Sequence, residues 1–241
     1  MLIECRTDKG KVRDINEDYI MVFKTNKYSL IIVADGMGGH NAGEIASKLA
    51  CITVRDFISQ NYITYDNNEE LIRDALVKAN NLVYEESQNN INYSGMGTTI
   101  TCCLISNDEL YLGHVGDSRA YIVNENGIKK ITEDHSYVQE LINNGSITEN
   151  EAVSHPQRNL ITRAIGAEKY VVVDTKHETI KEEDYIILCT DGLTSYLSND
   201  EIKDLIIEYG ILAVDKLINI ANDRGGYDNI SVIVAKRGDE K

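Results

Sequence analysis

Stretches rich in Ile, Val, Tyr and Thr recur along the chain and predict β-strands. They lie at about 17–23, 28–35, 97–105, 109–116, 118–123, 128–132, 170–180, 184–191 and 229–237. Residues typical of tight turns separate several of these strands: Asn107 with Asp108, Gly116 with Asp117, and the segment 124–127. The middle of the chain therefore predicts an antiparallel meander of hairpins and does not fit parallel βαβ units.

Helical patterns flank these strands. Apolar residues recur at steps of three and four in two long segments, and again beyond Asn199, which is expected to cap a helical region that continues after Gly210. The apolar positions are Ile45, Leu49 and Ile52, then Leu71, Ala75, Leu82 and Val83, then Ile202, Leu205, Ile206, Leu217 and Ile220. This arrangement predicts an α+β fold, a four-layer α-β-β-α sandwich of two antiparallel sheets flanked by helices.

One segment, from about Glu133 to Gly166, interrupts the pattern with short helical stretches and polar turns. It lies between strands that could otherwise connect directly, so we expect a surface insertion. The chain has one proline and no Pro/Gly/Ser-rich linker, and its 241 residues, 42% of them hydrophobic, suffice for a substantial core. We therefore expect one domain over residues 1–241.

The chain is strongly acidic, with a formal net charge of -15 at pH 7. Nucleic acid is an unsuitable partner, because that binding depends on Lys and Arg side chains that neutralise phosphates. The same acidity is unexpected in an enzyme that acts on phosphate groups, unless bound cations reverse the electrostatic field at the site.

Five cysteines form neither a Cys-x-x-Cys pair nor a Cys-x5-Arg phosphate loop, which disfavours a thiolate enzyme. The N-terminus lacks the apolar core of a secretory signal, and no run approaches the ~18 apolar residues of a membrane span. We expect reduced cysteines and a cytoplasmic protein without a membrane partner.

Two apolar runs, at 30–36 and 186–192, each end in Asp-Gly. A buried strand holds its last side chain rigidly, and the glycine lets the backbone turn so that its carbonyl can also face a cation. Asp-Gly is also a common turn pair, so a single occurrence would carry little weight. Because the pattern occurs twice, Asp35 and Asp191 are candidate metal ligands.

Three further aspartates lie at strand ends: Asp18 begins a predicted strand, Asp117 lies between two strands, and Asp228 precedes the last strand. If these ends converge, the five carboxylates form a site without histidine or thiolate. All-oxygen ligands select hard cations such as Mg²⁺ or Mn²⁺ over zinc. Like charges about 4 Å apart repel by roughly 1 kcal/mol in water and about 4 kcal/mol at an effective dielectric near 20, so bound cations would convert this cost into affinity.

Six spaced motifs carry a resemblance to a known family. They are Arg13-Asp14-Ile15-Asn16-Glu17-Asp18, Val33-Ala34-Asp35-Gly36-Met37-Gly38-Gly39-His40, Gly95-Met96-Gly97-Thr98-Thr99, Val115-Gly116-Asp117-Ser118-Arg119-Ala120, Thr190-Asp191-Gly192-Leu193 and Asp228-Asn229. Together they resemble the bacterial metal-dependent protein serine/threonine phosphatases of type two C, the PPM family. The resemblance extends in order along nearly the whole chain. It implies a sandwich of two antiparallel sheets, a metal cleft at one end and the insertion as a flap.

The resemblance also implies metal-binding roles. Asp35 would bridge two tightly bound ions, Mg²⁺ or Mn²⁺, and the Gly36 carbonyl would bind one of them. Asp191 and Asp228 would complete the first site. Asp117, together with Asp191, would hold a third, weaker metal.

Arg13 matches the family's phosphate-binding arginine, whose guanidinium fork can hold two phosphate oxygens. Asp18 resembles the residue that acts partly through metal-bound water. The implied reaction is in-line attack on phosphoserine or phosphothreonine by a water that bridges two metals, without a phosphoenzyme. Animal members carry histidine directly after Asp-Gly as general acid, whereas Met37 stands here, so a metal-bound water or His40 would supply the proton.

Two alternatives belong to other functional classes. A non-catalytic phosphatase-like binding module is expected to lack a metal aspartate, and none is missing. The net acidity disfavours a metal-dependent nuclease. A small-molecule phosphoesterase with two metals would be expected to include histidine ligands, which these motifs lack. The resemblance further implies phosphorylated proteins as partners, among them a serine/threonine kinase and its targets, with a monomer as the default. In the flap, Arg158 and Arg163 are candidate substrate contacts, although a passive surface loop explains them equally well.

Overall fold

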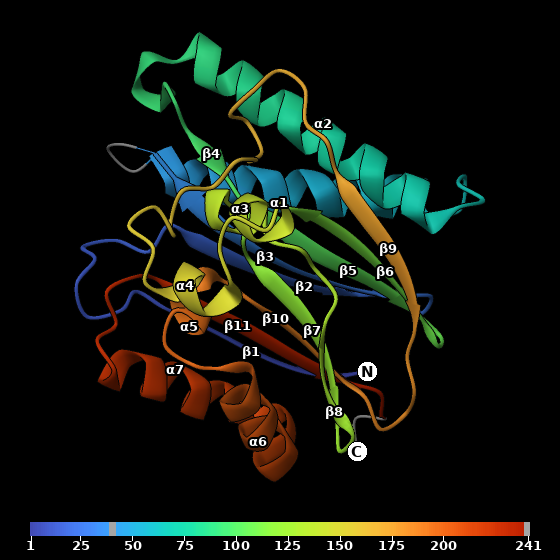
Figure 1. The fold of residues 1–241 in the computed structure, drawn as a ribbon. Helices are drawn as coiled ribbons and strands as arrows, with labels where there is room; N and C mark the ends of the chain where they lie inside the picture. Colours follow the sequence, from blue (N-terminus) through green and yellow to red (C-terminus); the bar gives the residue numbers. More distant parts are fainter. Residues whose placement is uncertain (39–41, 239–241) are drawn as a thin grey trace.

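The computed structural model describes residues 1–38 and 42–238, and its strands form two antiparallel sheets (Figure 1). The first sheet has the order β1-β11-β10-β7-β8, with the bounds Leu2–Asp8, Ile230–Lys236, Tyr185–Cys189, Arg119–Asn124 and Gly127–Lys130. The second has the order β2-β3-β5-β6-β9, with the bounds Asp18–Lys24, Ser29–Met37, Ile100–Ser106, Glu109–Val115 and Asp174–Thr179. In addition, β4 (Gly97–Thr98) pairs with the end of β3.

Helices cover the outer faces of both sheets (Figure 1). The helices α1 (Ala42–Asn61) and α2 (Asn68–Asn89) pack on the second sheet, and α6 (Asn199–Tyr209) and α7 (Ala213–Asp223) pack on the first. The short elements are η1 (Ile91–Tyr93), α5 (Asp191–Thr194) and η2 (Gly210–Leu212). The predicted four-layer α-β-β-α sandwich is confirmed.

The apolar sequence of β3 follows from burial on both of its faces. Leu30 and Ile32 pack towards α1 and α2, whereas Ile31 and Val33 pack between the two sheets. The strand β10 is buried on both faces in the same way. Both strands that lead to Asp-Gly are therefore held rigidly by the core.

The segment between β8 and β9 contains α3 (Tyr137–Asn143) and α4 (Glu149–Val153), which agrees with the short helical patterns expected there. The bridge Ser136↔Ile161 closes this segment on itself, and the bridge Thr98↔Ile165 joins it to β4. Because β4 pairs with the end of β3, the insertion reaches the edge of the sheet where Asp35 lies.

All five cysteines are free thiols, and only Cys5 is exposed. Burial raises the pKa of Cys102 and of Cys189 to about 12, so neither thiol supplies a nucleophile at neutral pH. Among the helices of the described chain, none is both long enough and apolar enough to cross a membrane.

Candidate metal centre

Asp18 and Asp35 face one another across the first strand pair of the second sheet, because the register of β2 and β3 places them directly opposite. Asp18 is buried, and its Oδ2 accepts hydrogen bonds from Thr190 Oγ1 at 2.8 Å and Ser231 Oγ at 2.7 Å. Both hydroxyls come from the first sheet. Asp18 therefore ties the two sheets together at this end, and its second oxygen is buried without a partner among the described residues.

The backbone at Asp35 is fixed by two threonines. Its N–H donates to Thr99 Oγ1 at 2.9 Å, and its carbonyl accepts from the Thr98 hydroxyl at 2.9 Å and from the Thr99 N–H at 2.8 Å. The next residue must be glycine, because a Cβ on Gly36 would lie 2.2 Å from the Gly43 carbonyl oxygen. The start of α1 thus packs directly against Asp35-Gly36, and β3 continues through this pair to Met37 instead of turning at the glycine as expected.

Asp191 and Asp228 come from the first sheet. Asp191 begins α5 directly after β10, and one of its carboxylate oxygens is buried without a partner in the described chain. Asp228 lies just before β11, and its Oδ2 accepts a hydrogen bond from Arg13 Nη2 at 2.9 Å. The two aspartates are close enough that Asp228 raises the pKa of Asp191, after burial, which is the larger cause.

Asp117 lies in the turn between β6 and β7. Gly116 has φ of 116°, and its N–H donates to His135 Nδ1 at 3.0 Å. On the other side of Asp117, the Ser118 and Thr99 hydroxyls are 2.9 Å apart, so this turn is linked to the backbone of Asp35. His135 and these hydroxyls were not recognised in the sequence as parts of the site.

Burial and neighbouring charges raise the pKa of Asp18, Asp35, Asp117 and Asp191. Burial is the first cause for Asp35, whose pKa lies well above its usual range, and the charges of the other four aspartates add to it. The pKa of Asp18 and of Asp117 is raised to about 7, mainly by burial, with Asp191 as the charged neighbour common to both. Five carboxylates from both sheets therefore share one electrostatic environment.

The donor set fits a hard divalent cation, because every donor is an oxygen and two buried carboxylate oxygens lack a partner. Within residues 1–38 and 42–238, however, no three acidic, histidine or cysteine side chains already have the spacing of a closed ligand shell. The Arg13–Asp228 ion pair engages one of the predicted ligands. The individual ligand assignments therefore stay predictions.

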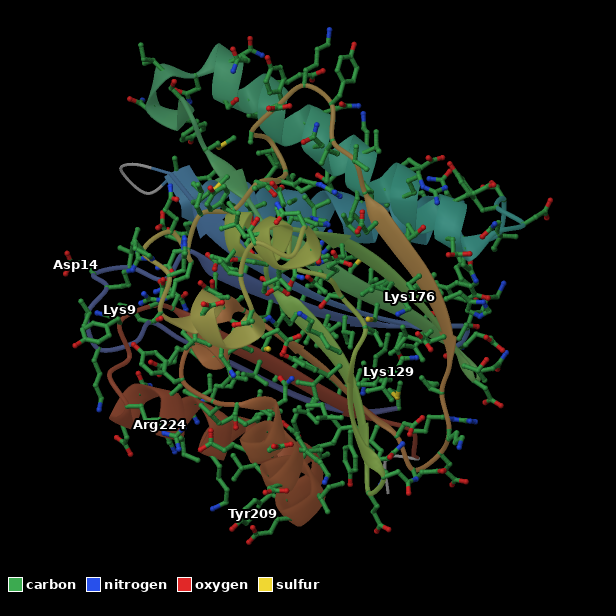
Figure 2. The ribbon with its side chains drawn as sticks, in the orientation of Figure 1. Lys9, Asp14, Lys129, Lys176, Tyr209 and Arg224 are labelled. Atoms are coloured by element: carbon green, nitrogen blue, oxygen red, sulfur yellow. The ribbon has the colours of Figure 1, made fainter. Side chains whose placement is uncertain are left out.

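Asn229 positions the loop that carries Arg13. Its amide donates to the carbonyls of Lys9 and Ile15, both at 2.9 Å, and its oxygen accepts from the Glu17 N–H at 2.8 Å. In Figure 2, Lys9 and Asp14 extend from the outside of this loop. The predicted proton donor His40 lies outside the described residues.

A set of paired charges borders the aspartates. Arg119 binds Asp134 through two nitrogens, with contacts of 2.6 to 3.1 Å. Asp174 accepts from Arg163 at 2.9 Å and lies 3.1 Å from His135 Nε2. Sequence reasoning missed these pairs because their partners are far apart along the chain.

An α-β-β-α sandwich in which carboxylates from both sheets meet at one end defines the architecture of the PPM-type protein phosphatases. Residues 9–218 match the family model described as protein phosphatase 2C. The chain belongs to this family, and it is a protein serine/threonine phosphatase.

Relatives match over nearly their full length. The serine/threonine phosphatase stp of Listeria welshimeri is 36% identical over 242 residues, which are 98% of this chain and 96% of the relative. The crystal structure of Stp1 from Staphylococcus aureus has a TM-score of 0.89 and 37% identity, with coverage of 98% and 95%. The catalytic domain of PstP, solved with 2 manganese ions, has a TM-score of 0.86 and 32% identity, with coverage of 99% and 98%.

Proposed function

We propose that this enzyme hydrolyses phosphoserine and phosphothreonine in proteins in a reaction that requires Mg²⁺ or Mn²⁺. The observation that carries the proposal is the pair of buried carboxylate oxygens, on Asp18 and Asp191, that have no partner in the described chain. An unpartnered buried carboxylate is costly unless a cation compensates it. The two manganese ions in the PstP structure support the same view.

Asp35, the Gly36 carbonyl, Asp191 and Asp228 would hold two cations, and Asp117 with Asp191 a third. Bound there, such cations supply positive charge for the phosphate and make water a stronger nucleophile. Keeping the centre intact requires the clamp of Thr190 and Ser231 on Asp18, which joins the two sheets.

Arg13 would bind two phosphate oxygens through its guanidinium fork. In the structure this side chain is half exposed and pairs with Asp228, which is one of the proposed ligands. The leaving hydroxyl needs a proton, and His40 is a proposed donor for it. A phosphorylated protein kinase and its targets are proposed substrates.

The test is phosphate release from a phosphothreonine peptide, compared between Mn²⁺ and chelator alone and between wild type and Asp191→Ala. We expect Mn²⁺-dependent release that is lost in Asp191→Ala and kept in Asp14→Ala, whose carboxylate is exposed on the neighbouring loop. Near-normal turnover of Asp191→Ala would contradict the metal assignment. If the folded wild-type protein is inactive with every metal, the non-catalytic binding module is favoured. If it is active only on small phosphate esters, the small-molecule phosphoesterase is favoured.

A further inference from the structure

A pocket of about 240 Å³ lies beside the metal centre, between the end of the flap and the segment that leads to β9. It is open to the surface. Its lining residues are Met37, Ile161, Thr162, Arg163, Ala164, Ala167, Glu168, Tyr170, Val171 and Val172. Most of these side chains are apolar, and none belongs to the predicted metal ligands.

The floor of the pocket continues the strand that carries Asp35. Met37 is two positions further along β3, so both side chains project from the same face, about 7 Å apart along the extended chain. Opposite Met37 in the register lies Gly97, where a Cβ would come within 2.7 Å of the Met37 methyl carbon. The glycine leaves room for this methionine between the metal centre and the pocket.

The wall of the pocket is held in place by hydrogen bonds. Ile165 and Thr98 exchange two backbone hydrogen bonds, of 2.8 and 3.0 Å. The fully buried Asn80 accepts from the Gly166 N–H at 2.8 Å and donates to the carbonyls of Glu168 and Lys169 at 3.1 and 3.2 Å. Because α2 and β4 fix both sides of the turn, the pocket is formed before any substrate arrives.

The rim is apolar and exposed. Tyr170 is 80% exposed and Val172 is 68% exposed, although both line the pocket. The volume is below that of sites for whole drug-sized molecules, which begin at about 300 Å³. Arg163 is engaged by Asp174 and Glu168 is acidic, so the pocket offers no free cation to an acidic group. The size of the pocket and its apolar lining suit one apolar side chain.

We propose that this pocket binds an apolar side chain of the phosphoprotein substrate, two or three residues from the phosphorylated residue. The proposal rests on the proposed function, because a peptide whose phosphate lies at Asp35 must pass over Met37 if it runs towards the flap. A spacing of about 7 Å corresponds to two residues of extended peptide. The pocket would thus select among phosphorylation sites by their apolar neighbours.

The experiment uses phosphothreonine peptides in which a single leucine is moved along both flanks of a Ser/Gly background. We expect kcat/KM to be about tenfold higher when leucine stands two or three residues away on one flank, which corresponds to about 1.4 kcal/mol. The double variant Tyr170→Ser/Val172→Ser should lose this preference and keep its rate on the leucine-free peptide. Leu212→Ser is the matched control, since Leu212 is also 68% exposed but lies in η2, which contacts β1 and β11 of the first sheet.

Three outcomes overturn the proposal. Equal kcat/KM for all leucine positions would show that no such subsite exists. A leucine preference that survives in the double variant would place the subsite elsewhere. If the double variant instead abolishes dimerisation of the protein and leaves the peptide rates unchanged, this face is a contact between two copies of the chain. None of these three outcomes contradicts the proposed function. Wild-type protein that is inactive on every peptide and on 4-nitrophenyl phosphate would contradict both the proposed function and the proposed subsite.

Discussion

Two sets of aspartates lie side by side at one end of the sandwich and differ in their partners. Asp18, Asp35 and Asp191 have raised pKa values, first because of burial and then because of the charges of neighbouring aspartates. Asp134 is also buried, yet the two-nitrogen contact with Arg119 holds its pKa below the usual range against the effect of burial. A buried carboxylate with a cationic side chain stabilises the fold, whereas one without such a partner is suited to bind a metal.

The largest expected effect comes from an unpaired aspartate. Asp35→Asn should lower turnover about 1000-fold or more, roughly 4 kcal/mol of transition-state stabilisation, because the bridging ligand is lost. The same change should raise the free energy of unfolding of metal-free protein by about 1 to 3 kcal/mol, since a neutral amide replaces a buried acid whose ionisation is opposed by burial and by its neighbours. Urea unfolding in chelator and phosphate release in Mn²⁺ measure the two quantities. A loss of stability would mean that Asp35 is structurally satisfied without metal.

Much of the unpaired set could be predicted from the sequence. Each member lies at a strand end, and the two Asp-Gly repeats mark Asp35 and Asp191 directly. Thr190 belongs to one of the recognised motifs and Ser231 lies inside an apolar run, but nothing in their spacing predicts that both hydroxyls hold Asp18. The ion pairs of Asp134 and Asp174 were not predicted either, because their partners come together only in the folded chain.

The fold could be predicted where the apolar periodicity was clear. The edge strand β1 was missed because the exposed residues Glu4 and Arg6 give it the pattern of a loop. The N-cap of α6 is Ser198, not the predicted Asn199, since Ser198 and Glu201 form a capping box. The two are neighbours with similar capping propensity, so only the observed hydrogen bonds separate them.

The buried face of α1 also differs from the predicted one. Its fully buried positions include Ala46 and Ala50, whereas the predicted Ile45 and Leu49 are only partly buried against the same core. Small residues let this helix approach β3 and α2 closely. A pattern based on the largest apolar residues cannot detect such a face.

The second prediction concerns the paired set. Asp134→Asn should cost about 3 kcal/mol of unfolding free energy, because the partly buried Arg119 guanidinium would lose its directly bonded carboxylate. Turnover per folded molecule in Mn²⁺ should change little, since Asp134 is not a predicted ligand. Urea unfolding with and without Mn²⁺ checks both points. An unchanged midpoint would show that water, not Asp134, compensates Arg119.

The third prediction uses pH. An acid whose folded pKa is about 7 instead of 3.8, such as Asp117, retains its proton only in the folded state between these values, so metal-free stability falls as pH rises from 4 to 7. His114, whose folded pKa is about 4 instead of 6.5, acts oppositely and costs stability as pH falls from 6.5 to 4. The slope is at most about 1.4 kcal/mol per pH unit for each proton.

Asp117→Asn isolates the acidic contribution to this pH dependence. Relative to wild type, the variant should gain metal-free stability progressively between pH 4 and 7, and the gain should vanish when Mn²⁺ is present. Thermal unfolding over this range in chelator measures the difference. A constant offset between the two proteins would show that the Asp117 carboxyl does not titrate there.

The smallest effect is expected for Asp174, the exposed member of the paired set. Its carboxylate is about half exposed, so Asp174→Asn should cost less than about 1 kcal/mol of unfolding free energy. The pKa of His135, which burial lowers and the hydrogen bond to Asp174 raises, should fall further when that carboxylate becomes an amide. An NMR titration of the His135 ring follows this change. A cost equal to that of Asp134→Asn would mean that pairing, independent of burial, controls the stability of this end of the molecule.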